Sequence, residues 1–220
     1  MKIYTRTGDN GTSSLLTGER RPKNNTVFHA LGTIDELSCC LGLASAHIDN
    51  HLILVKQLPQ YDVSIILQHL EHIQSRLQAL SSAIATPLYH SHEEGIVLPR
   101  SKRYEYVNFP ESIVSSELEQ WIDQLTEALP PLKQFILPSG GTPGCSLHYA
   151  RAVCRRAERF VIHMNFEREY PSVEDSVIKY LNRLSDYLFV ASRYITHGLG
   201  YAEKPCHLPH KQSDESTTKS

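Results

Sequence analysis

Apolar residues recur at spacings of three and four along most of the chain, which is the pattern of amphipathic α-helices. The clearest run includes Val63, Ile66, Leu70 and Ile84. It predicts a helix of about six turns that ends before Pro87, because the residue before a proline avoids the helical conformation. Few segments alternate with the period of two that a half-buried strand requires. The pattern therefore favours a helical protein.

The sequence around Thr33 indicates the start of an earlier helix. Thr33 is followed three residues later by Glu36, which is a capping-box signature, and Leu37 and Leu41 then continue an apolar stripe. Similar stripes predict helices over about residues 118–129, 145–167 and 172–198. Four or five long helices with almost no strand signal indicate an all-α bundle.

The segments between and beyond these helices are polar or rich in proline. Residues 87–111 hold three prolines without a clear period, so we expect a long connection there. Residues 1–200 are expected to form one domain, because no internal repeat or second core is visible. Residues 201–220 are expected to be a polar, disordered tail.

Charge and cysteine usage exclude several classes of protein. The 22 Lys and Arg residues against 24 Asp and Glu give a net charge of −2, which argues against a protein that grips nucleic acid. No apolar run approaches the roughly 20 residues of a membrane-spanning helix. The five cysteines form no CxxC pair, and the twelve histidines no HExxH pattern, so neither a zinc site nor a disulfide framework is expected.

A first candidate site is the polar segment from Thr5 to Lys23. It combines Gly8 and Gly11 with hydroxyl and cationic side chains, which resembles a phosphate cradle in composition. The GxxxxGK[ST] pattern of a Walker A loop is absent. The alternative interpretation is a flexible polar terminus.

A second candidate is a helix face rich in arginine. Arg151, Arg155, Glu158 and Arg159 follow the i, i+4, i+7 and i+8 spacing and so share one face. Arginines gathered this closely repel one another unless an anion lies among them, and the guanidinium fork suits phosphate or carboxylate. The alternative is a solvated charged face.

A third candidate is the polar face of the last predicted helix, which holds Asn182, Ser185 and Asp186. Polar side chains that face inward on neighbouring helices are how bundles build sites. The alternative is a surface ion pair between Arg183 and Asp186 at i,i+3 spacing. The residues alone thus predict an α-bundle with a site for a phosphate-bearing anion, and they leave the reaction undetermined.

Five motifs in order resemble one family. They are TRTGDNGTSSLLTGERRPK at 5–23, GTIDEL at 32–37, FILPSGG at 135–141, RAVCRRAER at 151–159 and NRLSDYLF at 182–189. Together they are similar to the ATP:cob(I)alamin adenosyltransferases of the propanediol-utilisation type, over about residues 2–198. The resemblance implies an up-down five-helix bundle, a homotrimer with active sites between subunits, and transfer of the 5′-deoxyadenosyl group of ATP to cob(I)alamin with release of triphosphate.

The resemblance also implies roles for individual residues. The implied ATP-binding residues are Thr5, Arg6, Thr7, Gly8, Ser13, Lys23, Arg155, Arg156, Glu158, Arg159 and Asn182. Asp35 and Arg151 match a salt bridge between subunits beside the corrinoid, and Asp186 is expected to contact cobalamin. Phe135 matches the aromatic residue at the lower axial face of cobalt, where it would leave a four-coordinate Co(II) that is easier to reduce. We therefore expect Arg155, Asp35, Arg151 and Phe135 to form the catalytic set.

Partners and surroundings follow from the same resemblance. ATP and cobalamin are the expected substrates, and Mg²⁺ is expected to be held mainly by the ATP phosphates rather than by a protein metal site. A cob(II)alamin reductase and an adenosylcobalamin-dependent enzyme are possible partners, whereas nucleic acid and membrane are not expected. The expected compartment is the cytoplasm, or the mitochondrial matrix if the chain is a processed form.

Two other functions stay open, and one position departs from the family pattern. The alternatives are a carrier that hands adenosylcobalamin to a mutase or dehydratase, and a nucleotide-binding helical module without transferase activity. Asn10 stands where lysine is frequent after TGD, which removes one cation from the expected phosphate site.

Overall fold

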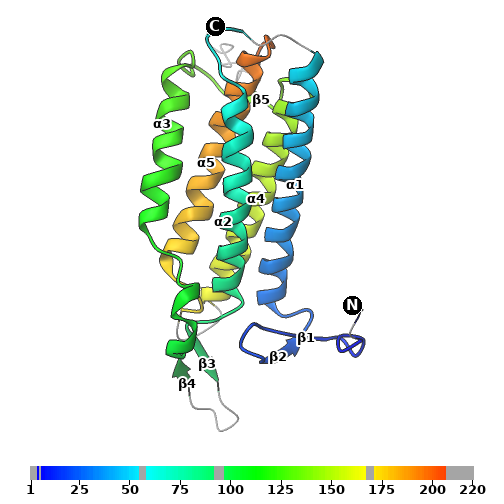
Figure 1. The fold of residues 1–220 in the computed structure, drawn as a ribbon, viewed down its shortest axis with the longest axis vertical. Coiled ribbons are helices and arrows are strands. Elements are labelled where there is room, and N and C mark those ends of the chain that lie inside the picture. The colour runs from blue at the N-terminus through cyan, green and yellow to red at the C-terminus, as the bar shows by residue number, and fades with distance from the viewer. Residues whose placement is uncertain (1–3, 5, 55–57, 92–96, 167–170, 207–220) are drawn as a thin grey trace, which may run out of the picture.

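Five α-helices run up and down beside one another in the computed structural model, which describes residues 4, 6–54, 58–91, 97–166 and 171–206 (Figure 1). The helices are α1 (Thr26–Leu54), α2 (Ser64–Ile84), α3 (Gln120–Glu127), α4 (Gly141–Phe166) and α5 (Asp175–Gly198). The predicted all-α, up-down five-helix bundle is therefore confirmed.

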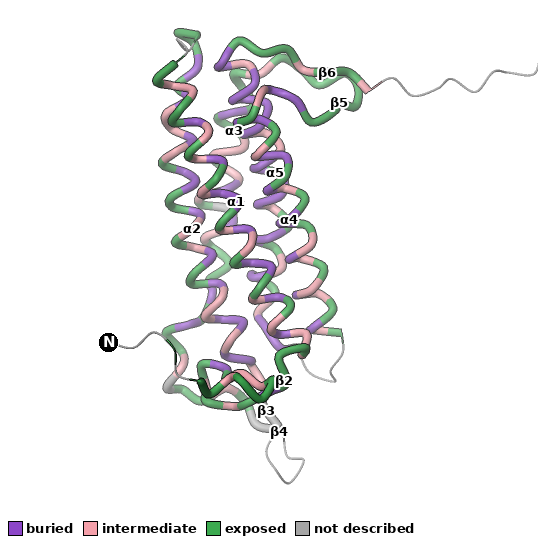
Figure 2. Tube along the Cα trace, turned by 90° about the vertical axis from the view of Figure 1, so that its right-hand side faces the viewer, coloured by how far each residue is buried: buried purple, intermediate pink, exposed green. Residues whose placement is uncertain are grey.

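The core lies between the inward faces of these helices (Figure 2). α1 packs on both α2 and α4, and α5 packs on α4 and α3. The predicted stripe of α2 is buried at Ile66, Leu70 and Ile84, and α5 contributes the fully buried rings of Tyr180 and Tyr187. Each such aliphatic side chain stabilises the fold by about 1.5–3 kcal/mol when it leaves water.

α1 begins earlier than its capping signature predicted. Asn25 Oδ1 accepts a hydrogen bond from the Val27 backbone N–H at 3.2 Å, which is the role of an N-cap side chain. Thr33 lies inside the helix, where its hydroxyl donates to the His29 carbonyl at 2.7 Å. The capping box at Thr33 and Glu36 was thus wrong, because a helical threonine can satisfy its hydroxyl one turn back.

By length and composition alone, α1 could cross a membrane. An 18-residue window of this helix has a mean hydropathy of 1.3. The expectation that no apolar run approaches the length of a membrane-spanning helix is therefore corrected for α1. Its buried side chains, among them Ile34, Leu41 and Ile48, belong to the core that α1 shares with α2 and α4. Core helices meet the same composition test.

The connection after α2 is structured rather than featureless. It contains the hairpin strands β3 (Tyr89–Ser91) and β4 (Val97–Pro99) and the 3-10 helix η1 (Lys102–Val107). Arg100 fastens it to the start of α5 through an ion pair with Glu174, in which the nitrogen and oxygen lie 2.7 Å apart. A π-helical turn, η2 (Val114–Glu119), then leads directly into α3.

Two further strand pairs lie at opposite ends of the bundle (Figure 2). β1 (Thr12–Ser14) and β2 (Arg20–Pro22) pair antiparallel where α1 begins. At the other end, β5 (Ile136–Leu137) pairs antiparallel with β6 (Lys204–Pro205). The predicted disordered tail therefore starts too early, because residues 204–205 are held by strand pairing, and its remainder from 207 lies outside the described residues.

Candidate active site

The N-terminal hairpin is organised by Arg20. One guanidinium nitrogen, Nη2, donates to the Thr7 carbonyl at 2.6 Å and to Thr12 Oγ1 at 2.5 Å, while Nη1 donates to Ser14 Oγ at 3.1 Å. These bonds join the glycine-rich turn to strand β1. The segment is consequently a shaped loop, and the alternative interpretation as a flexible terminus does not hold for it.

Lys23 and Gly8 meet in this loop. A Cβ atom at Gly8 would lie 3.1 Å from Lys23 Nζ, so the ammonium group rests close against the glycine backbone. The Lys23 backbone N–H donates to the Gly11 carbonyl at 2.9 Å. This bond fixes the backbone of Lys23 beside the glycine turn. The structure thus brings a cation and a glycine turn together, as anion binding requires.

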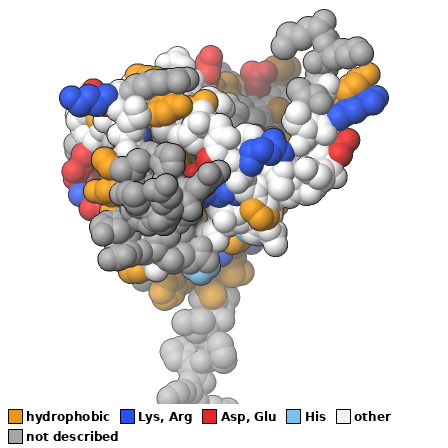
Figure 3. Space-filling model, turned by 90° about the horizontal axis from the view of Figure 1, so that it is seen from below, with side chains coloured by type: hydrophobic (Ala, Val, Ile, Leu, Met, Phe, Trp, Pro, Cys, Tyr) orange, Lys and Arg blue, Asp and Glu red, His pale blue; other side chains and the backbone are white. Residues whose placement is uncertain are grey.

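The other predicted residues of this segment lie around that turn. Arg6 has a φ of 60° and is exposed, and Ser13 stands opposite Arg21 in the hairpin. Thr5 lies outside the described residues. Figure 3 views this end of the molecule and shows Lys and Arg side chains (blue) separated by backbone and uncharged side chains (white).

The hairpin is attached to the bundle through its turn. The Leu16 N–H donates to the Ala85 carbonyl at 3.0 Å, just past the end of α2. In strand β2, Arg21 is buried and its Nε donates to Glu19 Oε1 at 2.6 Å. These contacts place the loop at the end of the bundle where α4 finishes and α5 starts.

The arginine face of α4 is only partly neutralised. Arg155 and Arg159 are exposed, and no carboxylate in the described part of the chain pairs with either side chain. Arg159 Nη1 donates to the Arg155 carbonyl at 3.0 Å. Glu158 Oε1 accepts from Asn182 Nδ2 at 3.0 Å, so it links α4 to α5.

Arg156 points to a different side of α4 and pairs with Glu36 of α1. Successive helical residues are turned by about 100°, which separates Arg156 from the face of Arg155 and Arg159. Its predicted contact with ATP stays a prediction. The structure shows that its charge already has a partner within the chain.

Asp186 takes part in the surface pair that was the alternative for this helix. Arg183 Nη1 lies 2.9 Å from Asp186 Oδ2, and Arg183 Nε donates to Glu119 at 3.0 Å. Its predicted contact with cobalamin stays a prediction.

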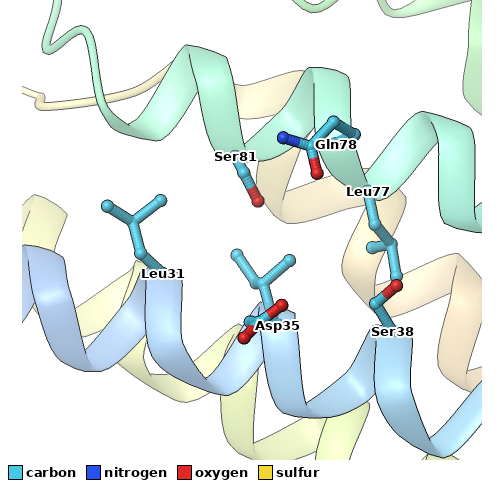
Figure 4. Close-up of a pocket in the computed structure, with 7 residues that line it drawn as sticks. Leu31, Asp35, Ser38, Leu77, Gln78 and Ser81 are labelled. Carbon is cyan, nitrogen blue, oxygen red and sulfur yellow. The ribbon is translucent and has the colours of Figure 1, made fainter. Parts of the chain in front are cut away.

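Asp35 lies at the rim of a cavity between α1 and α2 (Figure 4). The cavity holds about 200 Å³, and Leu31, Asp35 and Ser38 of α1 face Leu77, Gln78 and Ser81 of α2 across it. Asp35 is exposed, whereas its neighbour Glu36 turns toward α4. The carboxylate is therefore presented away from the arginine face of its own chain.

Arg151 has an unsatisfied group. Its Nε is buried, and no acceptor in the described residues bonds to it. One turn earlier on α4, His148 is buried with its Nε2 3.1 Å from Ser192 Oγ. Burial, followed by the charge of Arg151, lowers the pKa of His148 from 6.5 to about 4, so this imidazole stays neutral beside the guanidinium.

Phe135 lies at the opposite end of the bundle from the N-terminal hairpin, in the segment that leads into α4. Its side chain is 77% exposed, although it is a large apolar ring. Arg155 lies about 14 residues after Gly141, the first residue of α4. The helix therefore places Arg155 roughly 20 Å along its axis from the end where the Phe135 segment joins it. Along this axis the predicted residues follow the order Phe135, Arg151, Arg155, Arg159 and then the hairpin.

The sequence motifs did not reveal the roles of Arg20 and Glu36, which hold the candidate site in shape. Arg20 bonds mostly to carbonyl and hydroxyl oxygens of its own loop, and Glu36 pairs across to α4. Carbonyl partners leave no signature in a sequence, so only the cationic character of Arg20 pointed to the loop.

The described residues contain no group of three or more His, Cys, Asp or Glu that could hold a metal ion. The donors of the hairpin and of α4 are ammonium, guanidinium, hydroxyl and N–H groups, which bind anions rather than cations. The fold and site therefore define an all-α protein with a cationic surface of the kind that suits an anionic ligand.

Residues 3–195 match the family model of cobalamin adenosyltransferase, so the chain belongs to that family. It is a corrinoid adenosyltransferase of the PduO type, as the resemblance predicted. The chain is similar to the corrinoid adenosyltransferase MMAB of Homo sapiens, with 45% identity over 92% of this chain and 72% of that protein. It is also 36% identical to the corrinoid adenosyltransferase of Bacillus subtilis, over 92% of both.

Solved structures agree with these relatives. A PduO-type ATP:corrinoid adenosyltransferase from Lactobacillus reuteri, a phenylalanine-to-alanine variant complexed with cobalamin and ATP, superposes with a TM-score of 0.78. The two are 28% identical, and the match covers 94% of this chain and all of that one. An arginine-to-lysine variant complexed with ATP gives a TM-score of 0.74.

Proposed function

We propose that this chain transfers the 5′-deoxyadenosyl group of ATP to the Co(I) of a corrinoid, with triphosphate as the leaving group. The observation that carries the proposal is the order of groups along the bundle. Cations and the glycine turn lie at one end, the arginine face follows, and an exposed aromatic ring lies at the other end. The Lactobacillus reuteri relative is complexed with cobalamin and ATP, and this order of groups suits both molecules.

The cationic end suits the triphosphate. In the proposed reaction a Co–C bond forms at C5′ while the C5′–O bond to the triphosphate breaks, so negative charge grows on the leaving oxygen. Lys23 and Arg155 supply positive charge for it, and the loop holds Lys23 in place before ATP arrives. Charge that is positioned in advance stabilises a transition state more effectively than charge that must reorganise.

The aromatic end suits the corrinoid. An exposed phenylalanine gives a flat, apolar contact without a lone pair, so it can cover the lower face of cobalt without acting as a ligand. Removal of the axial base lowers the energy of the cobalt orbital that accepts the electron, and this favours reduction to Co(I). Mg²⁺ would travel with the ATP phosphates, and no step here depends on a protein metal site.

We also propose that a working site forms between copies of the chain, as a homotrimer. Asp35 and Arg151 make no ion pair with each other in the described chain, and they lie on different helices with Arg151 Nε unsatisfied. Two different faces that complement each other produce a heterologous contact, and a ring of three copies is the closed assembly that we propose for it. Light scattering checks this proposal, and a monomer at assay concentration would contradict it.

The test of the reaction is spectroscopic. Purified protein is given ATP, Mg²⁺ and chemically reduced cobalamin, and we expect the absorption spectrum of adenosylcobalamin to appear with repeated turnover. A carrier would bind adenosylcobalamin yet form none, and a nucleotide-binding module would bind ATP alone. Either result would replace the proposal.

A further inference from the structure

The segment that carries Phe135 has little packing to hold it. Between α3 and α4, residues 130–135 are all exposed, as are Leu137 and Pro138, and only Ser139 and Gly140, next to the start of α4, are buried. A ring that is 77% exposed gains little from burial, so apolar contacts cannot fix its place. Its position must depend on the backbone bonds of the segment.

Those bonds come from the residues after α5. The Cys206 N–H donates to the Phe135 carbonyl at 2.8 Å, and Leu137 stands opposite Lys204 in the β5–β6 pair. The Lys204 N–H also donates to Ser139 Oγ at 3.3 Å. A strand of only two residues is marginal by itself, so something else must hold β6 in place.

Arg193 of α5 is that anchor. Its Nε donates to Glu203 Oε1 at 2.6 Å, next to the start of β6. Its Nη2 donates to the Pro130 carbonyl at 2.8 Å, where the Phe135 segment begins. A single guanidinium therefore holds both the first residue of the segment and the strand that pairs with its end.

This ion pair is well removed from water. The side chains of Arg193 and Glu203 are 6% and 17% exposed, and His197 Nε2 lies 3.3 Å from the same carboxylate oxygen. The loss of one partner from a buried pair leaves the other charge unsatisfied, which disrupts the structure far more than the loss of a surface pair. We therefore expect the Arg193–Glu203 ion pair to hold β6 firmly in place.

The far end of the segment is also pinned to α5. Gly140 has a φ of 95°, and a Cβ there would lie 2.0 Å from Thr196 Oγ1. Only glycine permits this approach. The Phe135 segment is therefore attached to α5 at Pro130 and Gly140, while β6 supports the residues between them.

We propose that Arg193 and Glu203 are positioning residues for Phe135: their ion pair locks β6 against the segment and so fixes the ring. The inference rests on the proposed role of Phe135 beneath cobalt. It adds that β6 and the buried Arg193–Glu203 pair determine the position of the Phe135 ring. Neither of them touches the reacting atoms.

The test variant is Glu203→Gln, and the chain offers a matched control. Arg100 and Glu174 form a second ion pair at the other end of the bundle, with side chains 6% and 21% exposed and a separation of 2.7 Å. Glu174→Gln removes the same charge from a similar environment. Both full-length variants are compared with the unmodified chain, after circular dichroism has confirmed that each is folded.

The first measurement is hydrogen–deuterium exchange. In Glu203→Gln we expect amides of residues 131–140 and 200–206 to exchange at least tenfold faster, while those of the N-terminal hairpin do not change. Glu174→Gln should leave the first two segments as they are. Equal exchange of residues 131–140 in Glu203→Gln and the unmodified chain would overturn the proposal.

The second measurement is the share of four-coordinate Co(II), seen by electron paramagnetic resonance with cob(II)alamin and ATP. We expect Glu203→Gln to lower this share several-fold and to lower kcat, with KM for ATP unchanged. A share equal to that of the unmodified chain, despite faster exchange, would also overturn the positioning role. An unchanged signal in Phe135→Ala would instead remove the proposed function of the ring, and the exchange data would then decide whether the clamp exists.

Ser139→Ala covers the case in which Glu203→Gln does not fold. It removes the hydroxyl that joins Lys204 to the segment but keeps the buried ion pair. We expect a smaller change in both measurements and in the same direction. Unaltered exchange of residues 131–140 in this variant would count against the proposal.

Discussion

The exposed guanidinium of Arg155 has no carboxylate partner in the described chain, which leaves its charge available to a ligand. We expect Arg155→Ala to lower kcat by at least about 100-fold, because loss of one positioned charge or donor in a transition state costs that much. Thermal stability should not change, since the side chain is exposed. The measurement is the spectroscopic adenosylation assay with a melting curve.

Lys102→Ala is a fair comparison for that variant. Lys102 is another exposed cation, in η1, away from the arginine face. Its loss should leave kcat within a factor of two. A value of kcat near normal in Arg155→Ala would remove the assigned role of this residue.

Two buried histidines make stability depend on pH. Burial lowers the pKa of His69 and of His148 from 6.5 to about 4. Because the folded-state pKa lies below the unfolded value, the unfolded chain binds protons first as the pH falls. Stability is complete above pH 6.5 and declines between pH 6.5 and 4, by about 2 kcal/mol for each histidine at pH 5.

Urea unfolding at pH 7.5, 6 and 5 measures this decline. His69→Gln should reduce its steepness, since one of the two titrating groups is gone. His47→Gln, at a partly buried histidine of α1, is the control for the substitution itself. Parallel curves for all three proteins would contradict the assignment.

At the scale of single elements, the π-helical turn η2 has a clear task. Glu117 in η2 binds Arg76 and lies 2.9 Å from His72 Nε2, both on α2. Burial would raise the pKa of Glu117, but the bonds from Arg76 and His72 outweigh it and lower the pKa. The turn thus attaches the α3 side of the bundle to α2.

We expect Glu117→Gln to reduce the free energy of unfolding by about 2 kcal/mol, because it weakens a charge-assisted bond that is largely shielded from water. Glu119→Gln is the matched control in the same turn. Its partner Arg183 is more exposed, so the loss should stay below about 1 kcal/mol. Chemical denaturation measures both, and equal losses would refute the comparison.

Elements with a continuous apolar stripe could be predicted from sequence. α2 and α5 lie close to their expected bounds because burial of one face dictates their period. The start of α1 could not, since Asn25 and Thr33 are both plausible caps and only the folded context separates them. β5 and β6 were missed because two-residue strands 67 positions apart leave no local pattern.

The same division holds for the site. The arginine face could be predicted from helical spacing, because residues four positions apart, such as Arg155 and Arg159, lie on the same face of a helix. Arg156 joined the ATP-binding set through the resemblance and not through helical spacing. The structure pairs it with Glu36, and its contact with ATP stays a prediction. The role of Phe135 came from resemblance alone, as nothing in the local sequence marks an exposed ring as functional.

For the whole molecule, the proposed site between copies predicts complementation. If Asp35 of one copy works with Arg151 and Arg155 of the next, Asp35→Asn and Arg155→Ala should each be inactive alone. In trimers assembled from an equal mixture, about one site in four receives a normal side chain from both copies, because each contact joins two different faces.

We therefore expect about a quarter of normal activity after the two variants are unfolded together, mixed and refolded. Each variant refolded alone is the control and should stay inactive. Continued inactivity of the mixture, with light scattering showing normal assemblies, would mean that both residues serve the same site from one chain.

The length and hydropathy of α1 have a consequence for synthesis on the ribosome. α1 is complete at Leu54, but α4, its main packing partner, ends only at Phe166. At a synthesis rate of about 5–20 residues per second, the apolar face of α1 waits roughly 6–22 s for α4. During that interval the apolar face of α1 has no α4 to pack against, so the unfinished chain exposes more apolar surface than the completed bundle does.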